Sequence, residues 1–383
     1  MISTRSRARI LRGLALSAAA ALVLTGCTST AGATGGAAQP LKKEDLVLVA
    51  SVINTTNPYM ASNIAGAEAL SKKLDIPLEI VDSNGSSQTE ISKIQAILAK
   101  GKKVVLFVNT VASSDAPTIV NAVKAAGGYV TIWWNKPDNL DPAQVGDNFV
   151  AFQKIPGVES GKCNADALGE SLGGQGNVIM LPGVQDSTTS QTRVAGFKAQ
   201  MAEKYPDIEI LEERPSNWDP QLGYKNSQDL IAKYGDTIDG VWSADDAMQT
   251  GSMKAFKDAG LLDTTKFASD GLYPDTIASM QSGEGNNAIV GETFHRGYMA
   301  SAVGLYTAYL AAIGEIKPSE LPQEKRDSLF QLSCVTPDTL KDYLGYDAAD
   351  GPEKFVDSLI ENGPWDTEPM KLIGGGPEVL PSN

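Results

Sequence analysis

The stretch LVLVASVINTTNPYM, Leu46–Met60, decides the fold because it joins a strand to the start of a helix. The apolar run Leu46–Val52 predicts a strand. Asn57 followed by Pro58 is a typical helix start, since asparagine caps free N–H groups and proline fits the first turn. Helical spacing of apolar residues follows over Ala61–Leu74. The unit is a strand that leads directly into a helix.

The same alternation continues along the whole chain. Further strands are predicted at Leu78–Val81, Val104–Val108, Tyr129–Trp133, Val178–Leu181, Ile208–Leu211, Gly240–Ser243, Phe267–Ser269, Ala288–Gly291 and Leu329–Leu332. Helices are predicted at Thr89–Ala99, Pro117–Ala126, Gly157–Leu172, Thr192–Lys204, Leu222–Tyr234, Met248–Ala259 and Tyr298–Ile313. Alternating strands and helices build parallel sheets covered by helices on both faces. The pattern restarts near residue 150, so we predict an α/β fold of two doubly wound parallel-sheet lobes.

The first 26 residues have the features of an export signal. A basic start is followed by the apolar stretch Leu14–Leu24, which is shorter than the roughly 20 residues that span a bilayer. The ending Leu24-Thr25-Gly26-Cys27 resembles the lipobox of bacterial lipoproteins, which implies cleavage before Cys27 and lipid on that cysteine. The alternative is an ordinary secretory signal with an incidental cysteine. Residues 27–43 then predict a flexible tether.

The net charge limits the classes of partner, and the cysteines bear on the compartment. The formal net charge is −14, and loss of residues 1–26, with four arginines and no acid, makes it −18. This excludes nucleic acid as a partner and leaves lipid as the only membrane attachment. In an oxidising compartment Cys163 and Cys334 could form a disulfide. Two buried free thiols are the alternative.

Polar and aromatic side chains follow nearly every predicted strand. They are Asn54, Asn57, Tyr59, Asn109, Trp133, Trp134, Asn135, Lys136, Gln185, Asp186, Arg193, Trp218, Asp219, Asp245, Asp246, Asp270 and Glu292. In open α/β sheets the ligand binds beyond the carboxyl ends of the strands. Amides and carboxylates suit neighbouring hydroxyls, and indoles offer flat apolar faces. A neutral, hydroxyl-rich small molecule is therefore expected, although any single Asp or Asn could merely cap a helix.

Residues 45–336 resemble the sugar-binding proteins of bacterial ABC importers, of the ribose-binding type. The matches, in order, are NPYM, VNTVASSDA, TRVAGF, NWDPQLG, SADDAMQTGS and SDGLYPD. The resemblance implies a periplasmic binding protein of type I, a non-enzymatic solute-binding component. It would capture a sugar or polyol between its lobes, close around it and deliver it to an ABC permease. It also implies a monomer without cofactor or metal, held outside the cytoplasm by its lipid.

The resemblance also implies three hinge crossovers, near Phe149–Gln153, Glu292–Phe294 and Ser328–Gln331. The expected N-terminal lobe then comprises residues 44–150 plus 293–328. The expected C-terminal lobe comprises residues 151–292 plus 329–383, including a packed C-terminal extension after Pro337.

Matched to the family's motifs, ten residues are expected to contact the ligand. They are Asn57, Tyr59, Asn109, Trp134, Asn135, Arg193, Trp218, Asp245, Asp270 and Glu292. The sequence TIWWNK departs from the family, which commonly has an Asp-Arg pair after the fourth strand, and Trp134 and Asn135 occupy those places. Acids at 245 and 292 replace amides. These changes put ribose itself in doubt and permit another pentose, a hexose, a polyol or a non-sugar ligand.

The sequence also has features of three other function classes. Gly169–Gly173 matches G-x-S-x-G but ends a predicted helix, whereas a nucleophile elbow needs a strand before it. A triad would also need His295, the only histidine in the chain. Lactose-repressor-type regulators share the two lobes but carry a DNA-binding headpiece in front, where this chain has a signal and a tether. A lipoprotein that signals to a receptor kinase would use the same pocket.

Overall fold

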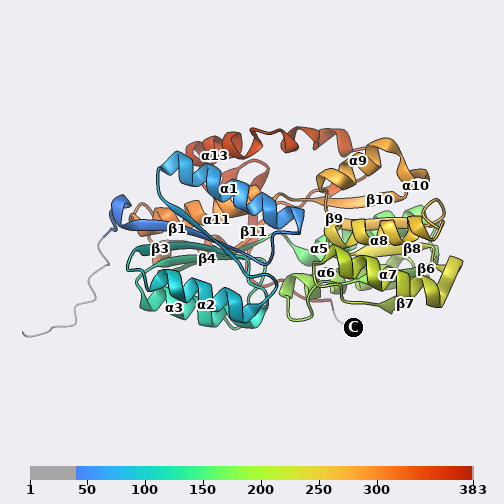
Figure 1. Cartoon of the computed structure of the whole chain (residues 1–383), viewed down its shortest axis with the longest axis horizontal. Helices are drawn as coiled ribbons and strands as arrows, with labels where there is room; N and C mark the ends of the chain where they lie inside the picture. Colours follow the sequence, from blue (N-terminus) through green and yellow to red (C-terminus); the bar gives the residue numbers. More distant parts are fainter. Residues whose placement is uncertain (1–39, 382–383) are drawn as a thin grey trace, which may run out of the picture. The chain divides into compact units, whose positions relative to one another are not determined.

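The computed structural model describes residues 40–381, which form two sheets of mainly parallel strands (Figure 1). The first sheet has eight strands in the order β13-β14-β11-β5-β4-β3-β1-β2. Its strands are β1 (Leu46–Val52), β2 (Leu78–Asp82), β3 (Lys103–Val108), β4 (Tyr129–Trp133), β5 (Phe149–Lys154), β11 (Asp327–Phe330), β13 (Asp366–Thr367) and β14 (Met370–Gly375). Every pairing among β1 to β5 is parallel, as expected.

The second sheet has six strands in the order β12-β10-β9-β8-β6-β7. Its strands are β6 (Gln175–Leu181), β7 (Asp207–Glu213), β8 (Gly240–Ser243), β9 (Lys266–Gly271), β10 (Ile289–Phe294) and β12 (Cys334–Val335). Only β12, at the edge, is antiparallel to its neighbour. We call each sheet with its helices a lobe.

Helices cover both faces of each sheet. The first lobe has α1 (Pro58–Leu74), α2 (Ser87–Leu98), α3 (Ala116–Ala125), α4 (Pro142–Val145), α11 (Gly297–Ala312), α12 (Gln323–Arg326) and α13 (Gly351–Asn362). The second has α5 (Gly157–Ser171), α6 (Thr188–Lys204), α7 (Pro220–Tyr234), α8 (Asp246–Asp258), α9 (Pro274–Ser282) and α10 (Glu284–Asn287).

Strand β1 shows why an uninterrupted apolar run was needed. Leu46, Leu48 and Ala50 belong to one buried cluster, whereas Val47 and Val49 belong to a second cluster on the other face of the sheet. Successive side chains of a strand point to opposite faces, and here both faces are covered.

The chain crosses between the lobes where the sequence predicted, and then crosses once more. It passes from β5 to α5, from β10 to α11 and from β11 to β12, close to the three expected crossovers. After β12 it returns, because α13 packs on α1 and α11 and β14 pairs with β11. The assignment of residues 329–383 to the C-terminal lobe is therefore wrong for most of this segment. The extension is packed, but on the first lobe.

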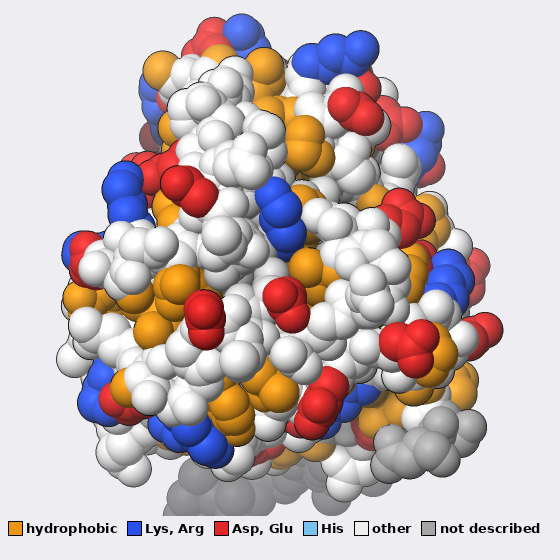
Figure 2. Space-filling view, turned by 90° about the vertical axis from the view of Figure 1, so that its right-hand side faces the viewer, with side chains coloured by type: hydrophobic (Ala, Val, Ile, Leu, Met, Phe, Trp, Pro, Cys, Tyr) orange, Lys and Arg blue, Asp and Glu red, His pale blue; other side chains and the backbone are white. Residues whose placement is uncertain are grey.

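Several expectations concern the ends and the surface of the protein. Cys163 and Cys334 form a disulfide, which confirms the pairing. The signal (1–26), Cys27 and most of the tether lie outside the described residues. Within residues 40–381, no helix is long and apolar enough to cross a membrane. The surface of the second lobe that is seen in Figure 2 carries interspersed acidic and basic side chains.

Candidate functional site

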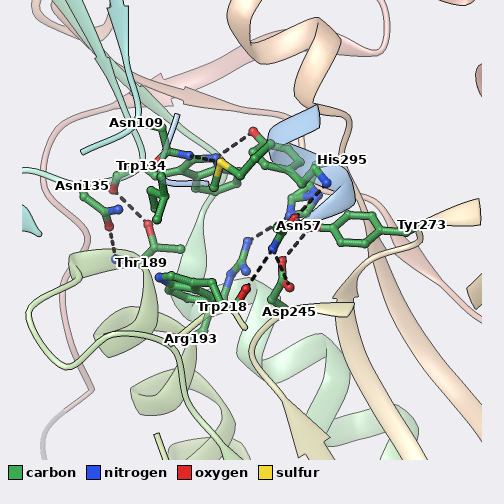
Figure 3. Close-up of a pocket in the computed structure, with 13 residues that line it drawn as sticks. Asn57, Asn109, Trp134, Asn135, Thr189, Arg193, Trp218, Asp245, Tyr273 and His295 are labelled. Atoms are coloured by element: carbon green, nitrogen blue, oxygen red, sulfur yellow. Dashed lines mark hydrogen bonds between the residues drawn. The ribbon is translucent and has the colours of Figure 1, made fainter. Parts of the chain in front are cut away.

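A small cavity of about 30 Å³ lies between the lobes (Figure 3). This volume is far below the roughly 300–1,000 Å³ typical of small-molecule sites, so a small molecule fits here only when the lobes move apart. Its lining residues are Ile53, Asn57, Tyr59, Met60, Asn109, Trp134, Asn135, Thr189, Arg193, Trp218, Asp245, Tyr273 and His295. Eight of the ten predicted contact residues are among them. The segments after β1, β3, β4, β8 and β9 all contribute, as the rule for open sheets requires.

Asn57 both begins a helix and faces the cavity. Its Oδ1 accepts a hydrogen bond from the Tyr59 backbone N–H at 2.8 Å, which caps α1. The cap fixes the amide, so Nδ2 points across the cavity and donates to Asp245 Oδ1 at 3.1 Å. Asp245 in turn caps α8 by accepting from Ala247 N–H at 2.8 Å. Both residues therefore cap a helix and also line the cavity.

Two indoles form opposite parts of the cavity wall, one from each lobe. Trp134 (φ 74°) and Trp218 (φ 62°) both have left-handed backbones, which costs about 1–3 kcal/mol at a non-glycine residue. Trp134 Nε1 donates to Tyr59 Oη at 2.7 Å. The Trp218 ring packs directly on Gly183. A Cβ at position 183 would lie 2.1 Å from a carbon of that ring. A glycine at 183 is thus required for this indole position.

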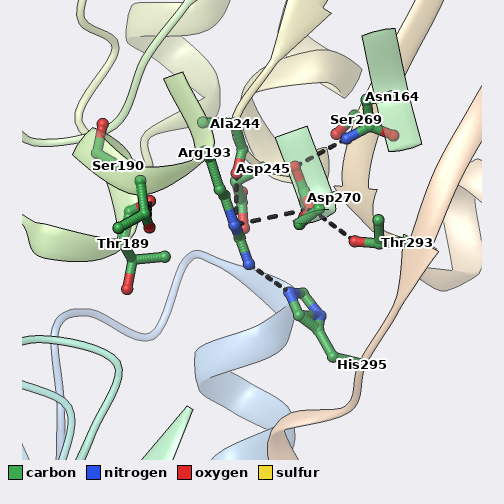
Figure 4. A network of polar contacts seen from close by, with 12 residues as sticks. Asn164, Thr189, Ser190, Arg193, Ala244, Asp245, Ser269, Asp270, Thr293 and His295 are labelled. Atoms are coloured by element: carbon green, nitrogen blue, oxygen red, sulfur yellow. Dashed lines mark hydrogen bonds and ion pairs between the residues drawn. The ribbon is translucent and has the colours of Figure 1, made fainter. Parts of the chain in front are cut away.

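Arg193 is the cation of the site, and the protein holds it on several sides (Figure 4). Its Nη1 donates to the Ala244 carbonyl at 2.6 Å, and its Nε lies 3.6 Å from Asp270 Oδ1. The guanidinium carbon lies 5.0 Å from the centre of the Trp134 ring, a cation–π contact between the lobes. The side chain is 4% exposed, so its geometry is preorganised.

His295 completes this contact as a neutral acceptor. Arg193 Nη2 lies 3.2 Å from His295 Nε2. A guanidinium can only donate, so Nε2 accepts and the ring proton is on Nδ1. Burial, followed by the charges of Arg193 and Arg296, holds the pKa of His295 well below its usual value. Among the described residues, Nδ1 has no hydrogen-bond partner.

Asp245 has an unusual protonation equilibrium. Burial raises its pKa to about 7, although the hydrogen bond from Tyr273 Oη at 2.6 Å opposes the shift. With Asn57 and Ala247 also donating to it, the carboxyl group has little free acceptor capacity.

Asp270 and Glu292, the other two predicted contacts, do not line the cavity. Asp270 accepts from Asn164 at 2.9 Å, from Thr293 at 2.6 Å and from Ser160, and it faces Arg193 from behind. Glu292 is fully buried and accepts from Gln249 Nε2 at 2.7 Å. Burial, and then the charge of Asp246, raises the pKa of Glu292 well above its usual value. Both residues support the wall of the site from within the second lobe.

The prediction missed five lining residues: Ile53, Met60, Thr189, Tyr273 and His295. Tyr273 lies in the quoted motif SDGLYPD, and His295 directly follows the last strand before a crossover. The rule that ligands bind beyond the carboxyl ends of strands, here called the strand-end rule, could therefore have predicted both. Thr189 gave no signal of its own.

The lobes also touch beside the cavity. Ser187 Oγ donates to Asn135 Oδ1 at 2.8 Å, and Thr189 Oγ1 donates to the Trp134 carbonyl at 3.0 Å. At the rim, Ser114 Oγ donates to Asp186 Oδ2 at 2.5 Å. These contacts between lobes mean that the structure is a closed form.

The G-x-S-x-G match does not lie in the structural context that a nucleophile elbow needs. Gly169–Gly173 begins inside α5 and has no strand before it. Within the described residues, no group of three or more His, Cys, Asp or Glu side chains could hold a metal ion.

Comparison with known proteins identifies the family. A model described as "Periplasmic binding protein domain" matches residues 48–310. The chain belongs to this family. Its members are solute-binding proteins rather than enzymes, and the family is extracytoplasmic.

Individual relatives are similar over most of the chain. A xylitol-binding protein of Mycolicibacterium smegmatis is 24% identical over 345 residues, covering 88% of this chain and 92% of that one. The ribose import binding protein of Escherichia coli is 27% identical over 248 residues, covering 64% and 79%. A solved structure of a twin-arginine translocation pathway signal protein from Burkholderia phytofirmans superposes with a TM-score of 0.79 at 27% identity, covering 87% and 99%. The fold is that of the type I periplasmic binding proteins.

Proposed function

We propose that this protein is the solute-binding component of an ABC importer and that it captures a small sugar or polyol between its lobes. The observation that carries the proposal is the cavity itself, with indoles and fixed polar groups from both lobes. Relatives named for xylitol and ribose binding support the same ligand class.

The hydrogen-bonding groups favour a neutral ligand with several hydroxyls. Trp218 Nε1 and His295 Nδ1 are buried donors, and Asn109 Oδ1 is a buried acceptor, each without a partner among the described residues. A hydroxyl can both donate and accept, so a polyol satisfies all three. The charge of Arg193 is already balanced by Asp270, so the site offers no free cation for an anionic ligand.

Binding would act by closure. A ligand held by both lobes binds the closed form more tightly than the open form and shifts the hinge equilibrium accordingly. The permease would then recognise the closed shape. We further propose that residues 1–26 are a signal peptide, that lipid on Cys27 anchors the protein outside the cytoplasm, and that it acts as a monomer.

A ligand screen tests the proposal. Mature protein is titrated calorimetrically with xylitol, ribose, other pentoses, hexoses and polyols, and its melting temperature is followed, because a ligand of the folded form raises it. We expect saturable binding of at least one of them. Absence of binding to every neutral sugar and polyol would contradict the proposal.

Two variants assign the site. Trp218→Ala should abolish binding, and Gly183→Ala should weaken it strongly, by about 100-fold, because its Cβ displaces the indole. Gly374→Ala is the matched control, since a Cβ there meets nothing within 4 Å. Circular dichroism confirms that each variant folds. Normal affinity in folded Trp218→Ala would exclude this cavity.

A further inference from the structure

A second cavity, of about 120 Å³, lies directly behind one wall of the first. Three residues line both cavities: Tyr59, Tyr273 and His295. Their rings pack together, with centroids 5.0 Å apart for Tyr59 and His295, 6.4 Å for Tyr59 and Tyr273, and 6.3 Å for Tyr273 and His295. These rings are shared walls between the two spaces.

Tyr273 is the member of this wall that comes from the second lobe, at the start of α9. Its ring packs against Gly271, where a Cβ would lie 2.4 Å from a ring carbon. Its hydroxyl is anchored on Asp245 Oδ2 at 2.6 Å, and the side chain is 4% exposed. Tyr59 and His295 are instead tied to Trp134 and Arg193.

The second cavity has its own polar groups. Arg296 donates to both carboxylate oxygens of Asp347, at 2.8 Å and 2.7 Å, and to the carbonyl oxygens of Gly271 and His295. Ser62, on α1, also lines the space, and its Oγ accepts from the Tyr298 N–H at 3.0 Å. An ion pair and a hydroxyl can bind further ligand hydroxyls.

We propose that Tyr273 determines ligand specificity as a partition, which limits the ligand to the length that the first cavity admits. Without its ring the two spaces join, and a hydroxylated ligand one sugar unit longer reaches Arg296 and Asp347. This inference rests on the proposed function, because it assumes a sugar or polyol in the first cavity.

The test compares Tyr273→Ala and Tyr273→Phe with the unmodified protein by calorimetric titration with xylitol, sorbitol, ribose and the longer disaccharide alditol maltitol. The unmodified protein and Tyr273→Phe should bind small ligands and exclude maltitol. Tyr273→Ala should bind maltitol at least about tenfold more tightly than the unmodified protein does. Tyr273→Leu, which keeps apolar contacts but is shorter, serves if the alanine variant fails to fold.

The outcomes separate the two claims. If folded Tyr273→Ala or Tyr273→Leu gains nothing for maltitol, or Tyr273→Phe gains as much, the partition is refuted while the proposed function stands. If the unmodified protein binds maltitol as tightly as xylitol, the partition is likewise refuted. If it binds no sugar or polyol at all, the proposed function falls, and the partition falls with it.

Discussion

At the scale of single residues, the site is built from side chains with two tasks. Asn57 caps a helix through Oδ1 and presents its Nδ2 to the other lobe. Asp245 Oδ1 caps a helix and also accepts from Asn57 across the lobes, while its Oδ2 accepts from Tyr273 of the same lobe. The same side chain serves both tasks. Because the cap already fixes its rotamer, binding does not have to restrict the rotation of that side chain. The closed form is therefore held by groups whose orientation is already set within each lobe.

The pKa of Asp245 gives a prediction on pH. Because burial raises this pKa from 3.8 to about 7, the folded protein holds a proton that the unfolded chain has already released between about pH 4 and 7. Stability from this group is present below pH 4 and is lost as the pH rises to about 7. Asp245→Asn should reduce that decline by up to about 1.4 kcal/mol per pH unit, measured by urea unfolding across this range.

Glu90 provides the matched control for this experiment. Burial also raises its pKa to about 7, and it accepts from Ser51 Oγ at 2.7 Å and from the Val111 N–H at 3.1 Å, away from the cavity lining. Glu90→Gln should flatten the pH dependence similarly while leaving ligand affinity unchanged. An unaltered slope in Asp245→Asn would mean that Asp245 titrates normally.

The strand-end rule predicted eight of the cavity residues because carboxyl ends of parallel strands meet at one edge. It misplaced Asp270 and Glu292 because both lie within strands β9 and β10, where successive side chains point to opposite faces. Sequence fixes the strand but not which of two neighbouring residues faces the crevice. Tyr273 and His295, a few residues later, occupy that role.

At the scale of elements, the C-terminal extension was the hardest part to predict. Its short strand β13 pairs only with its neighbour β14, whereas β14 also pairs with the distant strand β11. This antiparallel addition to β11 departs from the alternation of strands and helices from which the lobes were inferred. Its amphipathic helix α13, with Phe355, Val356 and Leu359 buried, showed only that it must pack somewhere. Local patterns do not identify the lobe that receives it.

The end of this extension predicts a stability effect at the first crossover. Glu378 Oε2 lies 2.8 Å from Lys154 Nζ on β5, and Oε1 accepts from the Val158 N–H on α5 at 2.8 Å. Both charged side chains are less than a tenth exposed, so Glu378→Ala leaves a buried ammonium unpaired. We expect a loss of about 3 kcal/mol in the free energy of unfolding, measured by urea denaturation.

The control is an exposed ion pair on the same extension. Asp350 and Lys354 lie 2.8 Å apart and are mostly exposed, so Asp350→Ala should cost less than about 1 kcal/mol. Equal costs for Glu378→Ala and Asp350→Ala would show that the buried pair adds nothing to stability.

At the scale of the whole molecule, the contacts that close the lobes are of two kinds. Some involve residues that line the cavity, whereas the contact of Asp186 with Ser113 and Ser114, at the rim, lies outside it. The rim contact therefore affects the balance between open and closed forms without altering the chemistry of the site. Apparent affinity depends on that balance, since it equals the intrinsic affinity multiplied by the closed fraction.

This separation gives a prediction on closure. Asp186→Ala removes about 0.5–1.5 kcal/mol from the closed form, so the apparent Kd should rise about twofold to tenfold where the open form dominates without ligand. Ligand should reduce the radius of gyration in X-ray scattering for both proteins, with the variant needing more ligand for the same compaction. Asp236→Ala, at an exposed acid of the second lobe, is the control and should match the unmodified protein. A variant Asp186→Ala with unchanged Kd and unchanged compaction would mean that the cavity contacts alone hold the lobes together, because the rim bond would then contribute nothing to the closed form.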